Sequence, residues 1–137
     1  MSIIHVVFAC VHNAGRSQMA AAFFNRAADP RLARATSAGT QPADRVHPEV
    51  LEVMAEVGVD LAAARPVLLT PDLVADAACV VTMGCGEHCP VVPGVEMLDW
   101  PFPDPKGQGL DAVRAIRDAV SGSVSRFVAE RGWGPGV

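Results

Sequence analysis

The sequence predicts a single α/β domain in which a parallel β-sheet is covered by helices on both faces. Short apolar runs rich in β-branched residues alternate with amphipathic helical patterns along the chain. No linker, internal repeat or low-complexity tract interrupts this alternation, so residues 1–137 form one domain. Half of the residues are hydrophobic, which is enough to build a sizeable core.

Four strands are predicted. The first, Ile3 to Ala9, is a continuous apolar run of the kind found in buried strands. A weaker strand at Ala35 to Ser37 is closed by Gly39, and two more follow at Cys79 to Met83 and Val95 to Leu98.

Helices are predicted between these strands from apolar spacing and capping residues. The first ends before the stop signal Asp29-Pro30. A later one begins with Thr70 as the N-cap residue and Pro71 in the first turn. The predicted spans are Ser17 to Ala28, Pro48 to Gly58, a helix starting at Pro71, and Leu110 to Arg131. The tail, residues 132–137, is expected to be frayed.

Composition excludes several classes of function. A net charge of −4 and a pI near 5.4 argue against a nucleic-acid or anionic-membrane partner. No apolar run has the length of a membrane span, and the N-terminal residues lack the features of a secretory signal. We therefore expect a cytoplasmic protein, in which four cysteines are packing residues, metal ligands or catalytic thiols rather than a disulfide scaffold.

The segment after the first strand has the pattern of an oxyanion site. In open α/β sheets, ligands bind beyond the carboxyl ends of the strands, and here Cys10 is followed by a tight loop that opens a helix. Successive backbone N–H groups and the positive end of the helix would attract an anion and favour the thiolate form of Cys10. Arg16 can bind two oxygens of a tetrahedral anion, and Ser17 is placed to donate a hydrogen bond to the sulfur. The predicted substrate-binding residues are Val11, His12, Asn13, Ala14, Gly15, Arg16 and Ser17.

These residues carry a family resemblance. Cys-Val-His-Asn-Ala-Gly-Arg-Ser-Gln-Met-Ala at 10–20, Ser-Ala-Gly-Thr at 37–40, Val-Val-Thr-Met-Gly-Cys-Gly-Glu-His-Cys-Pro at 80–90 and Asp104-Pro105 resemble arsenate reductases built on the low-molecular-weight tyrosine phosphatase fold. The resemblance covers nearly the whole chain in matching order. It implies a four-stranded parallel sheet flanked by helices, and Cys10 as the nucleophile.

The resemblance also assigns the acid. Asp104 lies in a proline-rich loop after the fourth predicted strand, again on the carboxyl side of the sheet. A carboxylic acid there could protonate the oxygen that leaves a thiol-bound oxyanion. The family gives this role to the Asp of its Asp-Pro pair, which is Asp104 here; an isolated Asp-Pro can also be a simple turn.

The same family supplies roles for Cys85 and Cys89. In the reductases, the nucleophile attacks arsenate, a second Cys attacks the adduct so that arsenite leaves, and a third Cys presents the resulting disulfide to thioredoxin. Cys85 would be the second thiol and Cys89 the third. The best-known members separate these cysteines by a longer segment, so a low-molecular-weight thiol such as mycothiol, or a glutaredoxin system, stands as another reductant for the Cys10 adduct. No tightly bound cofactor is expected.

Other interpretations use the same residues. No metal site is predicted. No strong zinc template is matched by Cys79, Cys85, His88 and Cys89, and Ala21 replaces the acidic residue with which some reductases hold a monovalent cation.

A tyrosine phosphatase would use Cys10, Arg16 and Asp104 with water, and would leave Cys85 and Cys89 without a role. It would also bind its substrate with aromatic side chains. The chain has no Tyr, so Trp100 and Phe102 are the candidates for that wall. A third alternative is an idle oxyanion-binding or redox-sensing module. Arsenate is the favoured substrate, with phosphate or sulfate able to enter the same loop.

Overall fold

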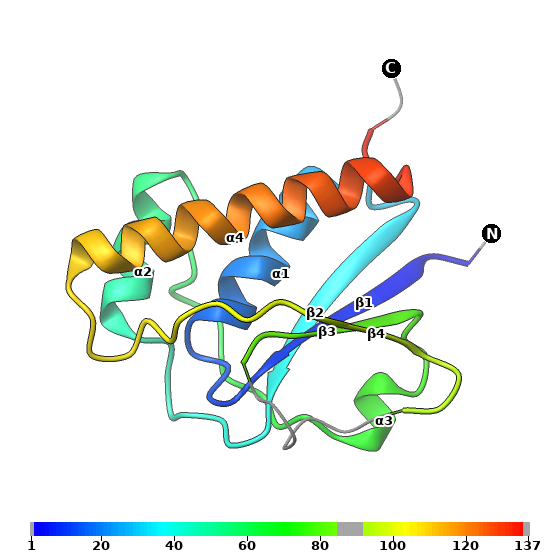
Figure 1. Ribbon diagram of the computed structural model, residues 1–137, viewed down its shortest axis with the longest axis horizontal. Coiled ribbons are helices and arrows are strands. Elements are labelled where there is room, and N and C mark those ends of the chain that lie inside the picture. Colours follow the sequence, from blue (N-terminus) through cyan, green and yellow to red (C-terminus); the bar gives the residue numbers. More distant parts are fainter. Residues whose placement is uncertain (1, 85–91, 136–137) are drawn as a thin grey trace.

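The computed structural model describes residues 2–84 and 92–135. It contains the predicted parallel sheet of four strands, in the order β2-β1-β3-β4, with helices on both faces (Figure 1). The elements are β1 (Ile4–Cys10), α1 (Arg16–Ala27), β2 (Ala33–Gly39), α2 (Pro48–Glu56), α3 (Pro71–Val74), β3 (Cys79–Thr82), β4 (Glu96–Asp99) and α4 (Leu110–Arg131). In the part of the chain that the structure describes, no helix is long and apolar enough to span a membrane.

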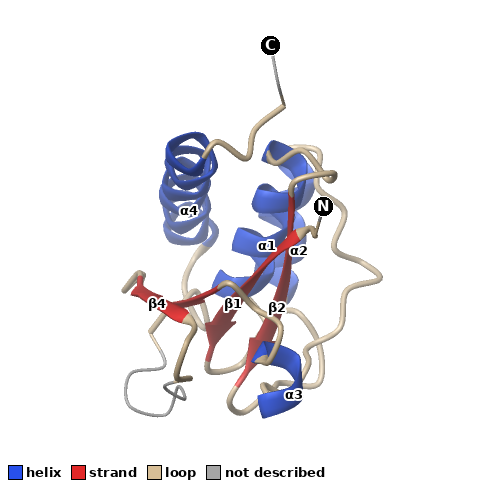
Figure 2. Cartoon of the chain, turned by 90° about the vertical axis from the view of Figure 1, so that its right-hand side faces the viewer, coloured by secondary structure: helices blue, strands red, loops and turns tan. Residues whose placement is uncertain are grey.

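The two faces of the sheet are covered unequally. Helices α1, α2 and α4 lie on one side and the short α3 on the other (Figure 2). Because side chains alternate along a strand, Val6 and Phe8 of β1 enter the larger core under α1 and α4, whereas Val7 and Ala9 face the smaller cluster beside α3. Cys10 continues the first series, so its sulfur is directed toward the side of the sheet that carries α1.

The observed elements match the predicted ones closely, and α4 has the predicted bounds. The main difference is β2, which was predicted as three residues and extends over Ala33–Gly39. This strand pairs with β1 along its whole length, from Ile4 opposite Ala33 to Cys10 opposite Gly39. Its small and polar residues give a weak strand signal, and the pairing partner overrides it.

The expectation of a frayed tail is wrong for Gly132 and Trp133. Gly132, with a φ of 71°, ends α4, and the Trp133 N–H donates to Val128 O at 3.0 Å. The Trp133 ring then packs edge-on against Phe24 and Phe127, and its carbonyl accepts a hydrogen bond from Asp29 N. The residues after α4 therefore close the apolar core at this end of the molecule.

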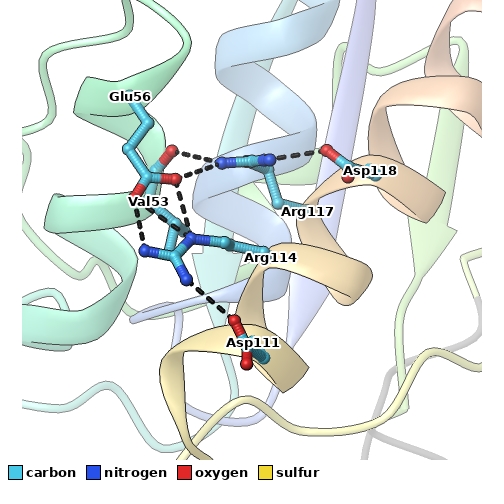
Figure 3. Close-up of polar contacts among 6 residues, drawn as sticks. All are labelled: Val53, Glu56, Asp111, Arg114, Arg117 and Asp118. Atoms are coloured by element: carbon cyan, nitrogen blue, oxygen red, sulfur yellow. Dashed lines mark hydrogen bonds and ion pairs between the residues drawn. The ribbon is translucent and has the colours of Figure 1, made fainter.

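A charged cluster joins α2 to α4 (Figure 3). Glu56, at the end of α2, accepts hydrogen bonds from both Arg114 and Arg117 of α4, with the shortest at 2.7 Å. These two guanidinium groups hold the pKa of Glu56 at about 2, well below its ordinary 4.5. The cluster fixes α2, whose first turn packs against the loop between β1 and α1.

Candidate active site

The sulfur of Cys10 lies at the carboxyl end of β1 and is almost completely buried. Its nearest polar neighbours are the hydroxyl of Ser17, 2.9 Å away, and the backbone N–H of Asn13, which points at the sulfur from 3.3 Å. Ser17 belongs to the first turn of α1, so the positive end of that helix is directed toward the thiol. The structure thus brings the Ser17 hydroxyl, the Asn13 N–H and the amino end of α1 beside Cys10.

The loop between β1 and α1 has its carbonyl groups turned away from its centre. Every carbonyl from Cys10 to Ala14 accepts a hydrogen bond from outside the loop, at 2.8–3.1 Å. The donors, in loop order, are the N–H groups of Thr40, Gln41 and Ala43, the side-chain amide of Gln18, and the N–H of His47. Among the residues that the structure describes, the N–H groups of Val11, His12, Ala14 and Gly15 have no acceptor. The loop thus offers a set of free donors next to Cys10, as a tetrahedral anion requires.

Asn13 gives the loop its sharp turn. Its φ of 49° is the only positive value at a non-glycine residue in the described chain. Its side chain is fully buried, and donates from Nδ2 to Ser17 Oγ at 2.7 Å. Asn tolerates this left-handed conformation better than most residues because its side chain bonds locally.

Arg16 is held in place before any anion arrives. Its side chain is 6% exposed, its Nη1 donates to Phe102 O at 3.1 Å, and its Nη2 lies 3.7 Å from Asp104 Oδ2. Gly84 makes room for it: a Cβ on Gly84 would collide with the guanidinium, and the φ of 93° at that residue disfavours any other side chain. The guanidinium has five N–H groups, so these two contacts leave further donors for the oxygens of a substrate.

Asp104 lies at the edge of the same site. Its carboxyl group is 42% exposed, and its Oδ1 accepts a hydrogen bond from the Lys106 N–H at 2.9 Å. This local bond leaves Oδ2 facing Arg16. The loop that carries Asp104 therefore meets the loop that carries Cys10, and a carboxyl group is placed where a leaving oxygen could receive a proton.

The two histidines of this region differ in their surroundings. His12, within the loop, has its Nδ1 3.2 Å from Gln41 O and is partly exposed. His47 donates its backbone N–H to Ala14 O and precedes α2. Burial lowers the pKa of the His47 ring below its ordinary 6.5, with Asp104 acting in the opposite direction, so this ring is neutral near pH 7. Neither ring donates to or accepts from the Cys10 sulfur.

Of the remaining thiols, Cys79 alone belongs to the described residues. Cys85 and Cys89, the predicted second and third thiols, lie outside the described residues, as does His88. Cys79 is buried at the amino end of β3 opposite Val6, four positions from Cys10 along β1, and burial raises its pKa to about 11. It is a core residue. Within residues 2–84 and 92–135, no three His, Cys, Asp or Glu side chains gather as a metal site would need.

The candidate aromatic wall is absent from the site. Trp100 packs against Phe8 and Phe127 in the core, with ring centroids 5.8 and 5.4 Å away. Phe102 is also partly buried against this core, and contributes its carbonyl to Arg16 rather than its ring to a pocket. Trp100 and Phe102, the aromatic candidates from the sequence, therefore both serve the fold.

Gln18 was not predicted, although it takes part in the site. It follows Ser17 in α1, is buried, and bonds to the carbonyl and the side chain of Asn13. A buried polar residue on the first turn of a helix that follows a catalytic loop is the signal that could have found it. The amides of Thr40, Gln41 and Ala43 carry no such signal, because backbone donors do not depend on residue type.

Comparison with known proteins decides the family. Residues 5–131 match the family described as low molecular weight phosphotyrosine protein phosphatase. The chain belongs to this family. Its sequence is 42% identical over 117 residues to a Halobacterium salinarum protein assigned as an arsenate reductase, covering 82% of each chain. It is 32% identical to a protein of Synechocystis named glutaredoxin arsenate reductase, over 91% of this chain and 96% of that one.

A solved structure agrees. The thioredoxin-dependent arsenate reductase of Corynebacterium glutamicum superposes with a TM-score of 0.80 at 38% identity. The match covers 93% of this chain and 61% of that one, so the chain spans less than two thirds of that relative. This member of the phosphatase family is thus similar, in sequence and in fold, to proteins that bear the name arsenate reductase.

Proposed function

We propose that this protein is an arsenate reductase, which converts arsenate to arsenite through an adduct on Cys10. One observation carries the proposal: the Cys10 oxyanion loop belongs to a chain that is 42% identical to a protein assigned as an arsenate reductase. The position of Trp100 supports it as well, because a phosphatase for aryl substrates would need that ring at the site and not in the core.

The first step joins the sulfur to arsenic. The free N–H groups of the loop and the remaining donors of Arg16 bind the arsenate oxygens, while the Ser17 hydroxyl supports the thiolate. Cys10 Sγ forms a bond to arsenic and one As–O bond breaks. Asp104 gives its proton to the departing hydroxyl, which leaves as water. No electrons have been transferred at this stage, and arsenic remains pentavalent.

The second step is the reduction. The thiolate of Cys85 attacks Cys10 Sγ, a disulfide bond forms, and the electron pair of the S–As bond remains with arsenic, which leaves as trivalent arsenite. Cys89 then attacks Cys85 and releases the Cys10 thiolate. The order of these two thiols follows the resemblance described above, and both residues lie outside the described chain.

An external thiol must reduce the disulfide between Cys85 and Cys89, since each turnover consumes two electrons. We propose a dithiol protein of the thioredoxin type, with a glutaredoxin- or mycothiol-type system as the alternative donor; relatives are named for thioredoxin and for glutaredoxin. We propose a cytoplasmic location on the same ground, because thioredoxin- and glutathione-type systems keep thiols reduced in the cytosol.

The deciding experiment measures arsenate-dependent NADPH oxidation. Separate assays contain thioredoxin with its reductase, glutaredoxin with glutathione, or mycothiol with its reductase. Hydrolysis of an activated aryl phosphate is measured in parallel. We expect sustained turnover with one thiol system and only slow phosphate hydrolysis. Rapid hydrolysis without arsenate reduction in any system would instead establish a phosphatase.

A further inference from the structure

A single side-chain amide joins the catalytic loop to a distant segment of the chain. Gln18 Nε2 lies 3.1 Å from Asn13 O, 3.2 Å from Asn13 Oδ1 and 3.2 Å from Arg65 O. Gln18 is 7% exposed, so its side-chain amide is shielded from water. Three oxygens thus share the two hydrogens of one NH₂ group, which is a donor only.

Two donors, one of them the Gln18 amide, determine which way the Asn13 amide points. Asn13 Oδ1 accepts from Gln18 Nε2 and also from the backbone N–H of Val67, at 2.9 Å. A reversed amide would place the Asn13 NH₂ group against these two donors. The NH₂ group is therefore directed to the opposite side, where Ser17 Oγ accepts its hydrogen bond at 2.7 Å.

The direction of the Asn13 amide also decides whether Ser17 can donate a hydrogen bond to the sulfur of Cys10. A serine hydroxyl has one hydrogen, and Ser17 Oγ already accepts from Asn13. Its own hydrogen is then free to point to Cys10 Sγ, 2.9 Å away. A hydrogen bond donated to sulfur favours the thiolate over the thiol. If the Asn13 amide were reversed, its oxygen would take the Ser17 hydrogen and the sulfur would lose this donor.

We propose that Gln18 is a positioning residue that, together with the backbone N–H of Val67, holds the direction of the hydrogen-bond chain Asn13–Ser17–Cys10. It acts on the nucleophile through two other side chains and touches neither the sulfur nor the place of the substrate. The inference rests on the proposed function only in taking Cys10 as the nucleophile.

The matched control for Gln18 is Asn25, on the same helix. Its side-chain amide bonds to both the N–H and the carbonyl of Ala35, at 2.8 and 3.0 Å, and so joins α1 to β2 as Gln18 joins α1 to the loop. No described contact connects Asn25 with Cys10. Gln18→Met and Asn25→Ala therefore each remove an amide that stabilises the fold, but only the first removes one of the two donors that hold the Asn13 amide and so loosens the chain to the sulfur.

The measurement is the rate at which iodoacetamide alkylates Cys10 between pH 5 and 9. Trypsin releases residues 1–16 as a peptide in which Cys10 is the sole cysteine, so mass spectrometry follows this thiol alone. For Gln18→Met we expect the midpoint of the pH profile to rise by roughly half a unit or more, because the thiolate loses a donor. Asn25→Ala should keep the wild-type profile while losing thermal stability. A wild-type profile for Gln18→Met, or an equal shift for Asn25→Ala, would overturn the proposal.

Gln18→Glu tests the direction of the bonds with little change of shape, and serves if the Met variant does not fold. A carboxylate at this place would face three acceptors and donate to none, whereas a protonated carboxyl has one hydrogen to offer. The alkylation rate of Gln18→Glu relative to wild type should therefore rise as the pH falls. A constant ratio across the pH range would contradict the assigned direction. Alkylation needs no arsenate, so a failure of the reductase proposal in the NADPH assay would leave this comparison valid.

Discussion

The ring of Pro105 lies directly against the backbone of Gly15. A Cβ added to Gly15 would come within 2.5 Å of Pro105 Cγ and 3.3 Å of its Cδ. Because Gly15 precedes Arg16 and Pro105 follows Asp104, this contact sets the separation between the loop of Cys10 and the loop of Asp104. The close approach of Pro105 leaves no room for a side chain at Gly15.

Gly15→Ala should therefore push the Asp104 loop away from Arg16. We expect arsenate turnover to fall by about tenfold or more, and the free energy of unfolding to drop by about 1–3 kcal/mol from overpacking. Steady-state kinetics and urea unfolding measure the two effects. Adding Pro105→Ala, which removes the obstructing ring atoms, should restore part of both. A single variant with wild-type kinetics would show that this contact does not position the acid.

Cys10→Ser should abolish arsenate reduction. A hydroxyl at this buried position stays protonated and cannot replace the thiolate as nucleophile. The variant should still bind phosphate or arsenate, since the loop donors are unchanged, and calorimetry can measure that binding. Arsenate-dependent turnover by this variant would remove Cys10 from the mechanism.

Arg16→Lys should fail as well. An ammonium group makes no planar two-point contact with an oxyanion and cannot at the same time donate to Phe102 O as Arg16 does. Kinetics with arsenate within about threefold of wild type would mean that the guanidinium geometry is not required.

Loss of Cys85 or Cys89 should separate the two stages of the reaction. Cys85→Ser should still bind arsenate and slowly hydrolyse an activated aryl phosphate, but release no arsenite over many turnovers with thioredoxin. Cys89→Ser should stop after about one equivalent, trapped as a Cys10–Cys85 disulfide. Mass spectrometry of linked peptides after one exposure to arsenate distinguishes these states. If both variants turn over like wild type, an external thiol resolves the Cys10 adduct directly.

The Glu56 cluster should contribute to acid sensitivity. The pKa of Glu56 is about 2 in the folded protein and near 4.5 ordinarily, because Arg114 and Arg117 donate to its carboxylate. Its contribution to stability is therefore complete above about pH 4.5 and is lost as the pH falls toward 2. The stability difference between wild type and Glu56→Gln, measured by urea unfolding, should shrink over that range. Glu52→Gln on the same helix, which has no ion pair among the described residues, should show no such trend; an equal trend for both would contradict the assignment.

The sequence was most informative for features that depend on residues close together in the chain. The apolar run before Cys10, the alternation of strands and helices, and the cap at Thr70 each follow from the residues themselves, and the structure contains all three. The end of α4 also had a local signal that the prediction overlooked: Gly132 followed by an apolar Trp133 is typical of a helix end that folds back on its last turn.

The rest depends on segments that meet only in the fold. Nothing near Gln18 in sequence indicates that Arg65 O would lie 3.2 Å from its amide, and nothing near Trp100 indicates that its ring would pack on Phe127. The length of β2 likewise comes from its pairing with β1 and not from its own residues. Long-range contacts of this kind decide which of several suitable side chains reach the site.

Cys79 can report on transient opening of the protein core, because its thiol is buried there. A thiol with a pKa of about 11, buried in the larger core between the sheet and the helices, is inert to alkylating agents at neutral pH as long as that core is closed. It reacts only in the rare moments when the core opens, as a slowly exchanging amide hydrogen does. Its labelling rate in dilute buffer would therefore measure the conformational stability of the core under native conditions, without denaturant.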